Sequence, residues 1–153
     1  MDFAVVAYDH QVKGATFAAQ ATGYPLAQTV KTLVVDLGGA AFGLALMPGD
    51  HQLALKKLAR VLGVKKTALV DARSAERLTG YHVGGISPFG IRRALLVAME
   101  ASLMAHARVL VNGGQRGIML EMRPQDIAAG LNCRLGDLLA EAPPRPDRPT
   151  TSE

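Results

Sequence analysis

The 153-residue chain contains no tryptophan, one cysteine, three tyrosines and four phenylalanines. So few aromatic residues disfavour a nucleic-acid-binding module that stacks bases over an aromatic sheet. The lone Cys133 cannot form a disulfide within the chain, which fits a reducing compartment. No apolar run approaches the roughly 18 residues of a membrane-spanning helix, and Met1 to Val6 lacks the pattern of a secretory signal. We therefore expect a cytoplasmic protein.

The motifs of several large enzyme classes are missing as well. The histidines show no His-x-x-x-His spacing and no neighbouring cysteine pair, so we expect no metal site. There is no Gly-x-Ser-x-Gly elbow, no P-loop and no Gly-x-Gly-x-x-Gly turn that opens a helix, which argues against serine hydrolases, nucleotidases and dinucleotide-binding enzymes. Cys133 lies in a segment typical of packing, and we interpret it as an inert thiol. We expect no cofactor, and any catalysis must use side chains or backbone groups outside these motifs.

The composition that remains is that of a globular domain, with 49% hydrophobic and 20% charged residues. The net charge of +4 and the pI near 9.5 favour approach by a polyanion, although charge alone is a weak indicator of RNA binding. We predict one domain over residues 1–142. Residues 143–153 include four prolines and are predicted to form a flexible tail.

Short strands and helices alternate along the chain in a way that predicts an α+β domain. Strands are expected over Phe3–Tyr8, Val30–Val35, Ala41–Met47, Thr67–Val70, Leu95–Met99, Val109–Asn112 and Ile118–Met122. Helices are expected over Ala15–Ala21, over Leu55–Leu62 with a cap at Asp50 and a stop at Gly63, over Ser74–Leu78, and from Pro124 to Leu131. Two strand pairs are joined by short turns as hairpins, so the sheet is predicted to be mixed and largely antiparallel, with helices packed on it.

Lys31 is the first candidate for a chemical role. Strand alternation places it on the same face as Leu33 and Val35, whose apolar character indicates a covered face. A partly enclosed ammonium could bind a phosphate or stabilise charge on a reacting carbonyl, and burial would lower its pKa. The periodicity alone favours the simpler alternative, a lysine at a strand end with its head in water.

Two glycine-rich segments are the next candidates. In Gly84-Gly85-Ile86-Ser87-Pro88 the glycines permit unusual backbone angles and close approach of a ligand, and Pro88 stiffens the exit. A purely structural turn explains this segment equally well. For Gly113-Gly114, a hairpin turn is the stronger explanation from the residues alone.

Four stretches of the chain resemble the YbaK/ProX family of aminoacyl-tRNA deacylases, and they occur in the family's order. They are Val30–Val35, Leu55–Ala59, Thr79–Gly90 and Asn112–Gly117. The resemblance runs from about Tyr8 to Leu139. It implies a YbaK-like domain fold, related to the editing insertion of bacterial prolyl-tRNA synthetases. It also implies an enzyme that hydrolyses the ester joining a wrong amino acid to tRNA.

The resemblance also implies roles for individual residues. Lys31 matches the family's key lysine, the catalytic candidate, which would hold the phosphate of the 3′-terminal adenosine or help to orient the ester. The loop from Gly84 to Pro88 would position the aminoacyl carbonyl, while a ribose hydroxyl of the tRNA assists the attacking water. The predicted substrate-binding residues are Tyr8, Phe17, Thr32, Gly84, Gly85, Ile86, Ser87, Pro88, Asn112, Gly113 and Gly114.

The resemblance is closest to the branch of the family that removes cysteine from proline tRNA, so Cys-tRNA(Pro) is the expected substrate of a metal-independent reaction. Asn112 departs from the Ser-Gly-Gly of many relatives, and Ala-tRNA(Pro) is the nearest competing substrate. The other hypotheses are a hydrolase of small aminoacyl-nucleotides and a non-catalytic module that binds tRNA or a synthetase. Aminoacyl-tRNA is the expected partner, and a complex with prolyl-tRNA synthetase is plausible.

Overall fold

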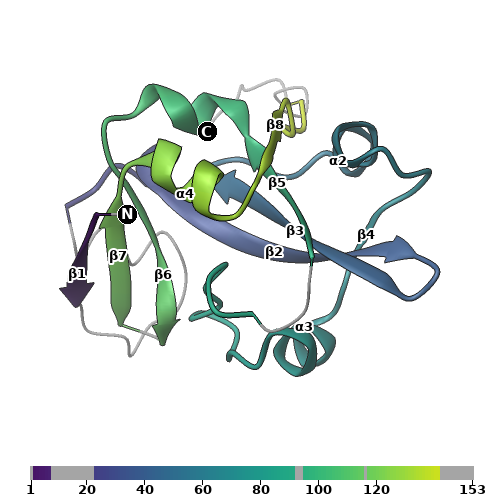
Figure 1. Cartoon of the computed structure of the whole chain (residues 1–153), viewed down its shortest axis with the longest axis horizontal. Coiled ribbons are helices and arrows are strands. Elements are labelled where there is room, and N and C mark those ends of the chain that lie inside the picture. Colours follow the sequence, from purple (N-terminus) through teal and green to yellow (C-terminus); the bar gives the residue numbers. More distant parts are fainter. Residues whose placement is uncertain (1, 8–22, 92–94, 116, 142–153) are drawn as a thin grey trace, which may run out of the picture.

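The computed structural model describes residues 2–7, 23–91, 95–115 and 117–141 of the chain (Figure 1). The predicted helix over Ala15–Ala21, the candidate residues Tyr8 and Phe17, and the predicted tail over residues 143–153 lie outside the described residues.

The described elements alternate strands with short helices. In chain order they are β1 (Phe3–Ala7), η1 (Leu26–Gln28), β2 (Thr29–Gly38), β3 (Ala41–Pro48), α2 (Leu55–Leu62), β4 (Ala68–Leu69), α3 (Ala72–Thr79), β5 (Leu96–Glu100), η2 (Ala101–Ala105), β6 (Val109–Gln115), β7 (Ile118–Met122), α4 (Pro124–Gly130) and β8 (Arg134–Gly136).

The strands form one sheet in the order β1-β7-β6-β2-β3-β5-β8, and β4 adds to β2 off this path. Antiparallel pairing joins β1 with β7, β6 with β7, and β2 with both β3 and β4. The pairs β2 with β6, β3 with β5, and β5 with β8 are parallel. The prediction of a mixed sheet in an α+β domain is therefore confirmed, with antiparallel pairs in a narrow majority among the described strands.

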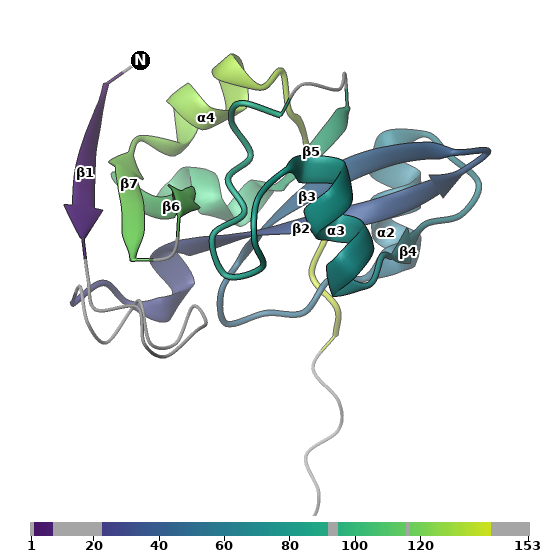
Figure 2. The ribbon, with the colours of Figure 1, turned by 90° about the horizontal axis from the view of Figure 1, so that it is seen from below.

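The two faces of the sheet bury separate apolar clusters. Val30 and Val34 of β2 belong to the first cluster, which includes Ala75 of α3 and Ile127 of α4. Val35 belongs to the second cluster, which includes Leu58 and Leu62 of α2. Figure 2 shows the result, because α3 lies in front of β2 and β3 while α2 lies behind them. Successive residues of β2 thus face different surroundings, as the period of two requires.

The helix ends show which local signals were reliable. Gly63 ends α2 in the left-handed conformation with φ of 71°, as predicted. The predicted cap at Asp50 is wrong, because α2 begins after Ala54, which makes no side-chain capping bond. For α3, the predicted start at Ser74 is late. The helix begins at Ala72, and the carboxylate of Asp71 caps it by accepting a hydrogen bond from the Ser74 N–H at 2.7 Å.

The start of β2 is fixed by polar contacts with β6 and β7. The Tyr24 hydroxyl donates to the Glu121 carboxylate, and burial together with this bond raises the pKa of Tyr24 to about 12. The Gln28 side chain donates to the Arg108 carbonyl at 3.0 Å, just before β6. These contacts set where β2 meets β6, and so they set the position of the residues that follow on β2.

Glu100 is the one charged residue in the buried set of the described chain, with 3% of its surface exposed. Its two carboxylate oxygens accept hydrogen bonds from the N–H groups of Ser102 and Leu138, each at 2.8 Å. We expect Glu100→Ala to lower the free energy of unfolding by about 2 kcal/mol, because the buried Leu138 N–H and the part-buried Ser102 N–H lose their acceptor. Glu100→Gln keeps one acceptor oxygen and should lose about half as much. Urea unfolding measures both, and equal losses would contradict this account.

Candidate functional site

The hydrogen-bonded pairing of β2 with β6 is short. It joins Thr29 with Leu110 and Val30 with Val111, and then the two strands separate. On the same edge of β2, the Val34 carbonyl accepts a hydrogen bond from the Val70 N–H at 3.3 Å, and Val35 and Asp36 then pair with β4. Figure 1 shows β6 and β4 at opposite ends of β2. Residues 31–33 of β2 therefore lie on a stretch of sheet edge between β6 and the segment that contains β4.

Lys31 is the first residue of this stretch, and it is half-buried. It pairs across the sheet with Met47, which is fully buried in the second cluster, so Lys31 lies on the face that α2 covers. Burial lowers the pKa of the Lys31 ammonium, and the nearby Asp50 carboxylate opposes that shift. Lys31 is therefore a cation in partly desolvated surroundings, where it attracts an anion more strongly than a lysine in open water does.

Thr32 follows on the opposite face, between Val30 and Val34 of the first cluster. It is 8% exposed, and its Oγ1 atom makes no hydrogen bond within the described part of the chain. A buried hydroxyl without a partner costs about 1–3 kcal/mol, so such a group calls for a ligand or another partner. No other buried side-chain oxygen or nitrogen atom of the described residues is left in this way.

The loop that follows α3 is fixed at both ends by side chains. Glu76 of α3 accepts a hydrogen bond from the Val83 N–H at 2.8 Å, and the Thr79 hydroxyl accepts one from the Tyr81 N–H at 3.1 Å. At the other end, the buried Ser87 accepts from the Phe89 N–H at 3.1 Å. Ile86 packs in the first cluster, on the face of the sheet that Thr32 shares. The loop is therefore held in one shape before any ligand arrives.

Tyr81 links this loop to the hairpin of β6 and β7. Its hydroxyl donates to the Phe89 carbonyl at 2.5 Å, which spans the loop from one side to the other. Its ring lies against Gly114, where an added Cβ would be 2.8 Å from the Tyr81 Cε1 atom. Gly114 also has φ of +97°, a conformation that favours glycine. The two glycine-rich segments singled out in the sequence are thus neighbours in the structure.

The structure therefore divides the predicted site residues into groups. Thr32 shares the first cluster's face with the Gly84–Pro88 loop, and Tyr81 joins that loop to Asn112–Gly114. Lys31 lies at the same level of β2 but on the other face. Tyr81 had no assigned role in the sequence, although an aromatic residue inside a glycine-rich loop was a usable signal.

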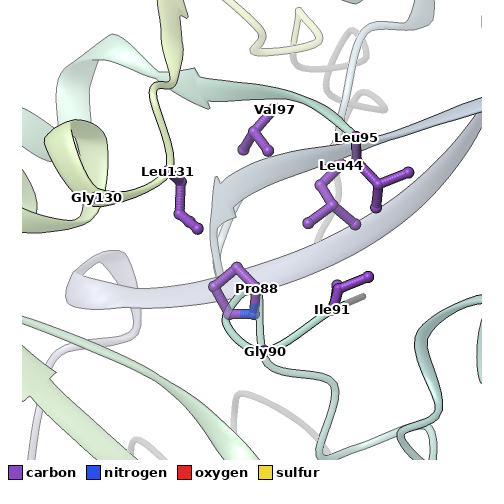
Figure 3. A pocket seen from close by; sticks show the side chains of 8 residues that line it. All are labelled: Leu44, Pro88, Gly90, Ile91, Leu95, Val97, Gly130 and Leu131. Carbon is purple, nitrogen blue, oxygen red and sulfur yellow. The ribbon is translucent and has the colours of Figure 1, made fainter. Parts of the chain in front are cut away.

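A separate pocket of about 230 Å³ lies beside the exit of the loop. Its lining comes from β3, β5, the loop and the end of α4, and consists of Leu44, Pro88, Gly90, Ile91, Leu95, Val97, Gly130 and Leu131. Figure 3 shows the Pro88 ring among these side chains. Pro88 is the predicted site residue that lines it, and Lys31, Thr32 and Asn112 do not. None of the described lining residues has a charged side chain, so these residues supply no acid or base.

Other reactive groups in the described chain lie outside this arrangement. Burial raises the pKa of the Cys133 thiol to about 11, which leaves very little thiolate near neutral pH. Among residues 2–7, 23–91, 95–115 and 117–141, no group of three His, Cys, Asp or Glu side chains is placed to hold a metal ion. In the same residues, no helix has the length and apolar character that crossing a membrane requires.

Comparison with known proteins gives one family. The model of the aminoacyl-tRNA editing domain matches residues 9–129, which include Lys31, the Gly84–Pro88 loop and Asn112–Gly114. The match thus covers most of the chain and every candidate site residue except Tyr8.

Individual relatives agree with that match. The chain is 29% identical over 120 residues to EbsC of Enterococcus faecalis, a proposed Cys-tRNA(Pro)/Cys-tRNA(Cys) deacylase, covering 78% of this chain and 73% of that one. It is 30% identical over 97 residues to the proline–tRNA ligase of Trichlorobacter lovleyi, covering 63% of this chain and 17% of the ligase. A crystal structure of a proposed trans-editing enzyme for prolyl-tRNA synthetase superposes with a TM-score of 0.82 at 27% identity, covering 91% of this chain and 87% of that one.

Proposed function

The chain belongs to the aminoacyl-tRNA editing domain family, and from this premise we propose that it is a trans-editing hydrolase, which cleaves the ester between a wrong amino acid and its tRNA. The observation that carries the proposal is the separation of β2 from β6 directly after Val30. At this level of β2 a half-buried cation and a buried, unpartnered hydroxyl occupy consecutive positions, Lys31 and Thr32. A ligand lying along the open edge could reach both.

In this proposal Lys31 binds the anionic end of the substrate. The phosphate of the 3′-terminal adenosine is the nearest anion to the ester in aminoacyl-tRNA, and a partly desolvated ammonium attracts it strongly. The same charge can orient the ester by fixing the nucleotide that bears it. Lys31 then contributes mainly by positioning the substrate. In a small site without a strong acid or base, such positioning is a large part of the rate acceleration that the protein can supply.

Thr32 and the Gly84–Pro88 loop act on the aminoacyl group. The unpartnered Thr32 hydroxyl would bond to the amino acid, which removes the cost of leaving it buried and unsatisfied. In the loop, the Gly85 N–H is already bonded to the His82 carbonyl at 2.9 Å. The Gly84, Ile86 and Ser87 N–H groups make no hydrogen bond to a described residue, so they are the loop's available donors to the ester carbonyl as it gains negative charge.

The reaction requires a water molecule to attack that carbonyl. Of the predicted site residues that the structure describes, none is a histidine, aspartate, glutamate or cysteine. We therefore assign the activation of the water to a ribose hydroxyl of the terminal adenosine, in a reaction that is independent of metal. The tRNA leaves with its free hydroxyl, and the amino acid leaves as a carboxylate.

Cys-tRNA(Pro) is the substrate we propose, and the similarity to EbsC supports it. The alternative is Ala-tRNA(Pro), because contacts that distinguish a thiol from a hydrogen are worth only about 1–3 kcal/mol and a few side chains can redirect them. A complex with prolyl-tRNA synthetase would supply tRNA selection, which fits the relation of this domain to segments of proline–tRNA ligases.

The test is deacylation of Cys-tRNA(Pro), Ala-tRNA(Pro) and Pro-tRNA(Pro) by the purified protein, with and without a chelator. We expect rapid loss of a mischarged tRNA, slow loss of Pro-tRNA(Pro), and no inhibition by the chelator. Alkylation should leave the rate unchanged, because Cys133 is not used and reacts slowly. Binding of all three without turnover would replace this proposal with a non-catalytic tRNA-binding module.

A further inference from the structure

The positive charge of the chain is concentrated in one segment. Residues 51–70 contain five lysines and arginines and no acidic residue, whereas the rest of the chain has twelve basic and thirteen acidic residues. The net charge of +4 therefore arises entirely from this segment, which contains α2, the turn that follows it and β4.

Four of these five side chains are exposed, and they come from α2 and the turn that follows it. Lys56 and Arg60 are four residues apart on α2, so they lie on the same side of the helix. The Thr67 hydroxyl donates to the Leu55 carbonyl at 2.7 Å, which folds the chain back and brings Lys65 and Lys66 to the first turn of α2. We call Lys56, Arg60, Lys65 and Lys66 the α2 basic surface.

Among the described residues, no carboxylate forms an ion pair with the α2 basic surface. The fifth basic residue, Lys57, is paired with Asp137 at 2.8 Å, but the other four form no ion pair within the described residues. The arginines of α3 differ in this respect. Arg73 and Arg77 are also exposed and four residues apart, but they share their helix with Glu76, and both interact with Asp71.

The α2 basic surface is connected to the candidate site by the edge of β2. β4 pairs with β2 at Val35 and Asp36, and continuing that antiparallel register places Lys66 near the level of Gly38. Gly38 is seven positions after Lys31 on β2, which is roughly 23 Å at the rise of a β-strand. A stacked nucleic-acid strand advances about 3.4 Å per nucleotide, so this distance corresponds to roughly six or seven nucleotides.

From this arrangement we infer that the α2 basic surface binds the phosphate backbone of the tRNA acceptor end, several nucleotides away from the terminal adenosine held at Lys31. The inference rests on the proposed function for the identity of the polyanion. Phosphate contacts of this kind carry no sequence information, but they position the strand and contribute a salt-dependent part of the affinity. The substrate thus lies along the open edge of β2, from Lys31 towards β4.

A pair of matched double variants tests the inference. Lys56→Gln/Arg60→Gln and Arg73→Gln/Arg77→Gln each remove two positive charges from exposed positions four residues apart on a helix. We expect the α2 pair to weaken binding of uncharged tRNA about tenfold at low salt and to lower the slope of log affinity against log salt by about 2. The α3 pair should change the affinity less than twofold.

Deacylation then separates this inference from the proposed function. We expect the α2 pair to raise KM for a mischarged tRNA and to leave cleavage of a minimal aminoacyl-adenosine unchanged. Equal effects of the two pairs on tRNA binding, or an unchanged salt slope in the α2 pair, would overturn the inference. If the wild-type protein cleaves no substrate, the proposed function fails, while binding of uncharged tRNA still decides the role of the surface.

Discussion

Lys31→Ala is expected to lower kcat/KM for the mischarged tRNA by about 10²-fold, the size of loss that misplacing a bound substrate can cause. The physical reason is that Lys31 is a half-buried cation at the point where β2 leaves β6, and alanine leaves no charge there to hold the substrate phosphate. Single-turnover deacylation measures the loss. Arg73→Ala, which removes an exposed cation on α3, is the control and should retain nearly full activity.

Variants of Lys31 should lose deacylation activity without losing stability. Burial lowers the pKa of Lys31 below 10.5, so the folded state disfavours its charged form. Lys31→Met keeps the length of the side chain and removes that charge, and it should not lower the free energy of unfolding at pH 7. A variant that is inactive because it is unfolded would refute this interpretation of Lys31→Ala, and circular dichroism with urea unfolding distinguishes the two.

The lowered pKa of Lys31 also predicts the direction in which the free energy of unfolding changes with pH. Because the folded-state pKa of Lys31 is lowered, the unfolded chain binds more protons between that value and 10.5. The free energy of unfolding of the wild type should therefore rise with pH through this window, relative to Lys31→Met. Below the window both states of the wild type are protonated, and the difference between the two proteins should be constant.

Gly114→Ala is expected to lower the free energy of unfolding by about 3 kcal/mol, from backbone strain and overpacking together. The new Cβ would be 2.8 Å from the Tyr81 Cε1 atom, and Tyr81 cannot easily move because its hydroxyl is bonded to the Phe89 carbonyl. To relieve this clash, the loop that contains Tyr81 must move away from the β6–β7 hairpin. The rate of deacylation should therefore fall as well. Urea unfolding and initial deacylation rates measure the two effects.

Gly38→Ala is the matched control for this variant. Gly38 also has a positive φ, of +85°, but nothing lies within 4 Å of an added Cβ, so only the backbone strain of about 1–2 kcal/mol applies. The double variant Tyr81→Ala/Gly114→Ala removes the contact and should lose less stability than the sum of its single variants. Additive losses would mean that the ring and Gly114 do not interact.

The sequence predicted those parts of the fold that depend on local patterns. The periodicity of α2 and the glycine at its end were sufficient, and so was the alternation of β2. β8 was missed because its three residues, Arg134–Gly136, are a strand only through parallel pairing with β5. The predicted cap at Asp50 was wrong because α2 begins only after Ala54. The Ala54 N–H donates a hydrogen bond to the Leu138 carbonyl just before the helix begins.

For the site, strand alternation indicated that Lys31 is partly covered, and the structure has it half-buried. The separation of β2 from β6 could not be foreseen, because it depends on pairing between segments about 80 residues apart. The same holds for the contact of Tyr81 with Gly114. Whether Lys31 or Thr32 shares a face of the sheet with the Gly84–Pro88 loop likewise depends on how the sheet is assembled.

The irregularity near the tip of the β2–β3 hairpin indicates where relatives of this protein can accept inserted residues. The register shifts between Asp36 and Gly38, whereas the pairs from Val30 with Pro48 to Asp36 with Phe42 are continuous. Residues inserted at the tip would lengthen the turn and leave Lys31 opposite Met47. One residue inserted between Thr32 and Val34 would instead exchange the two faces for part of the strand. Natural insertions should therefore accumulate at the tip, and the seven residues from Val30 to Asp36 should keep a constant spacing.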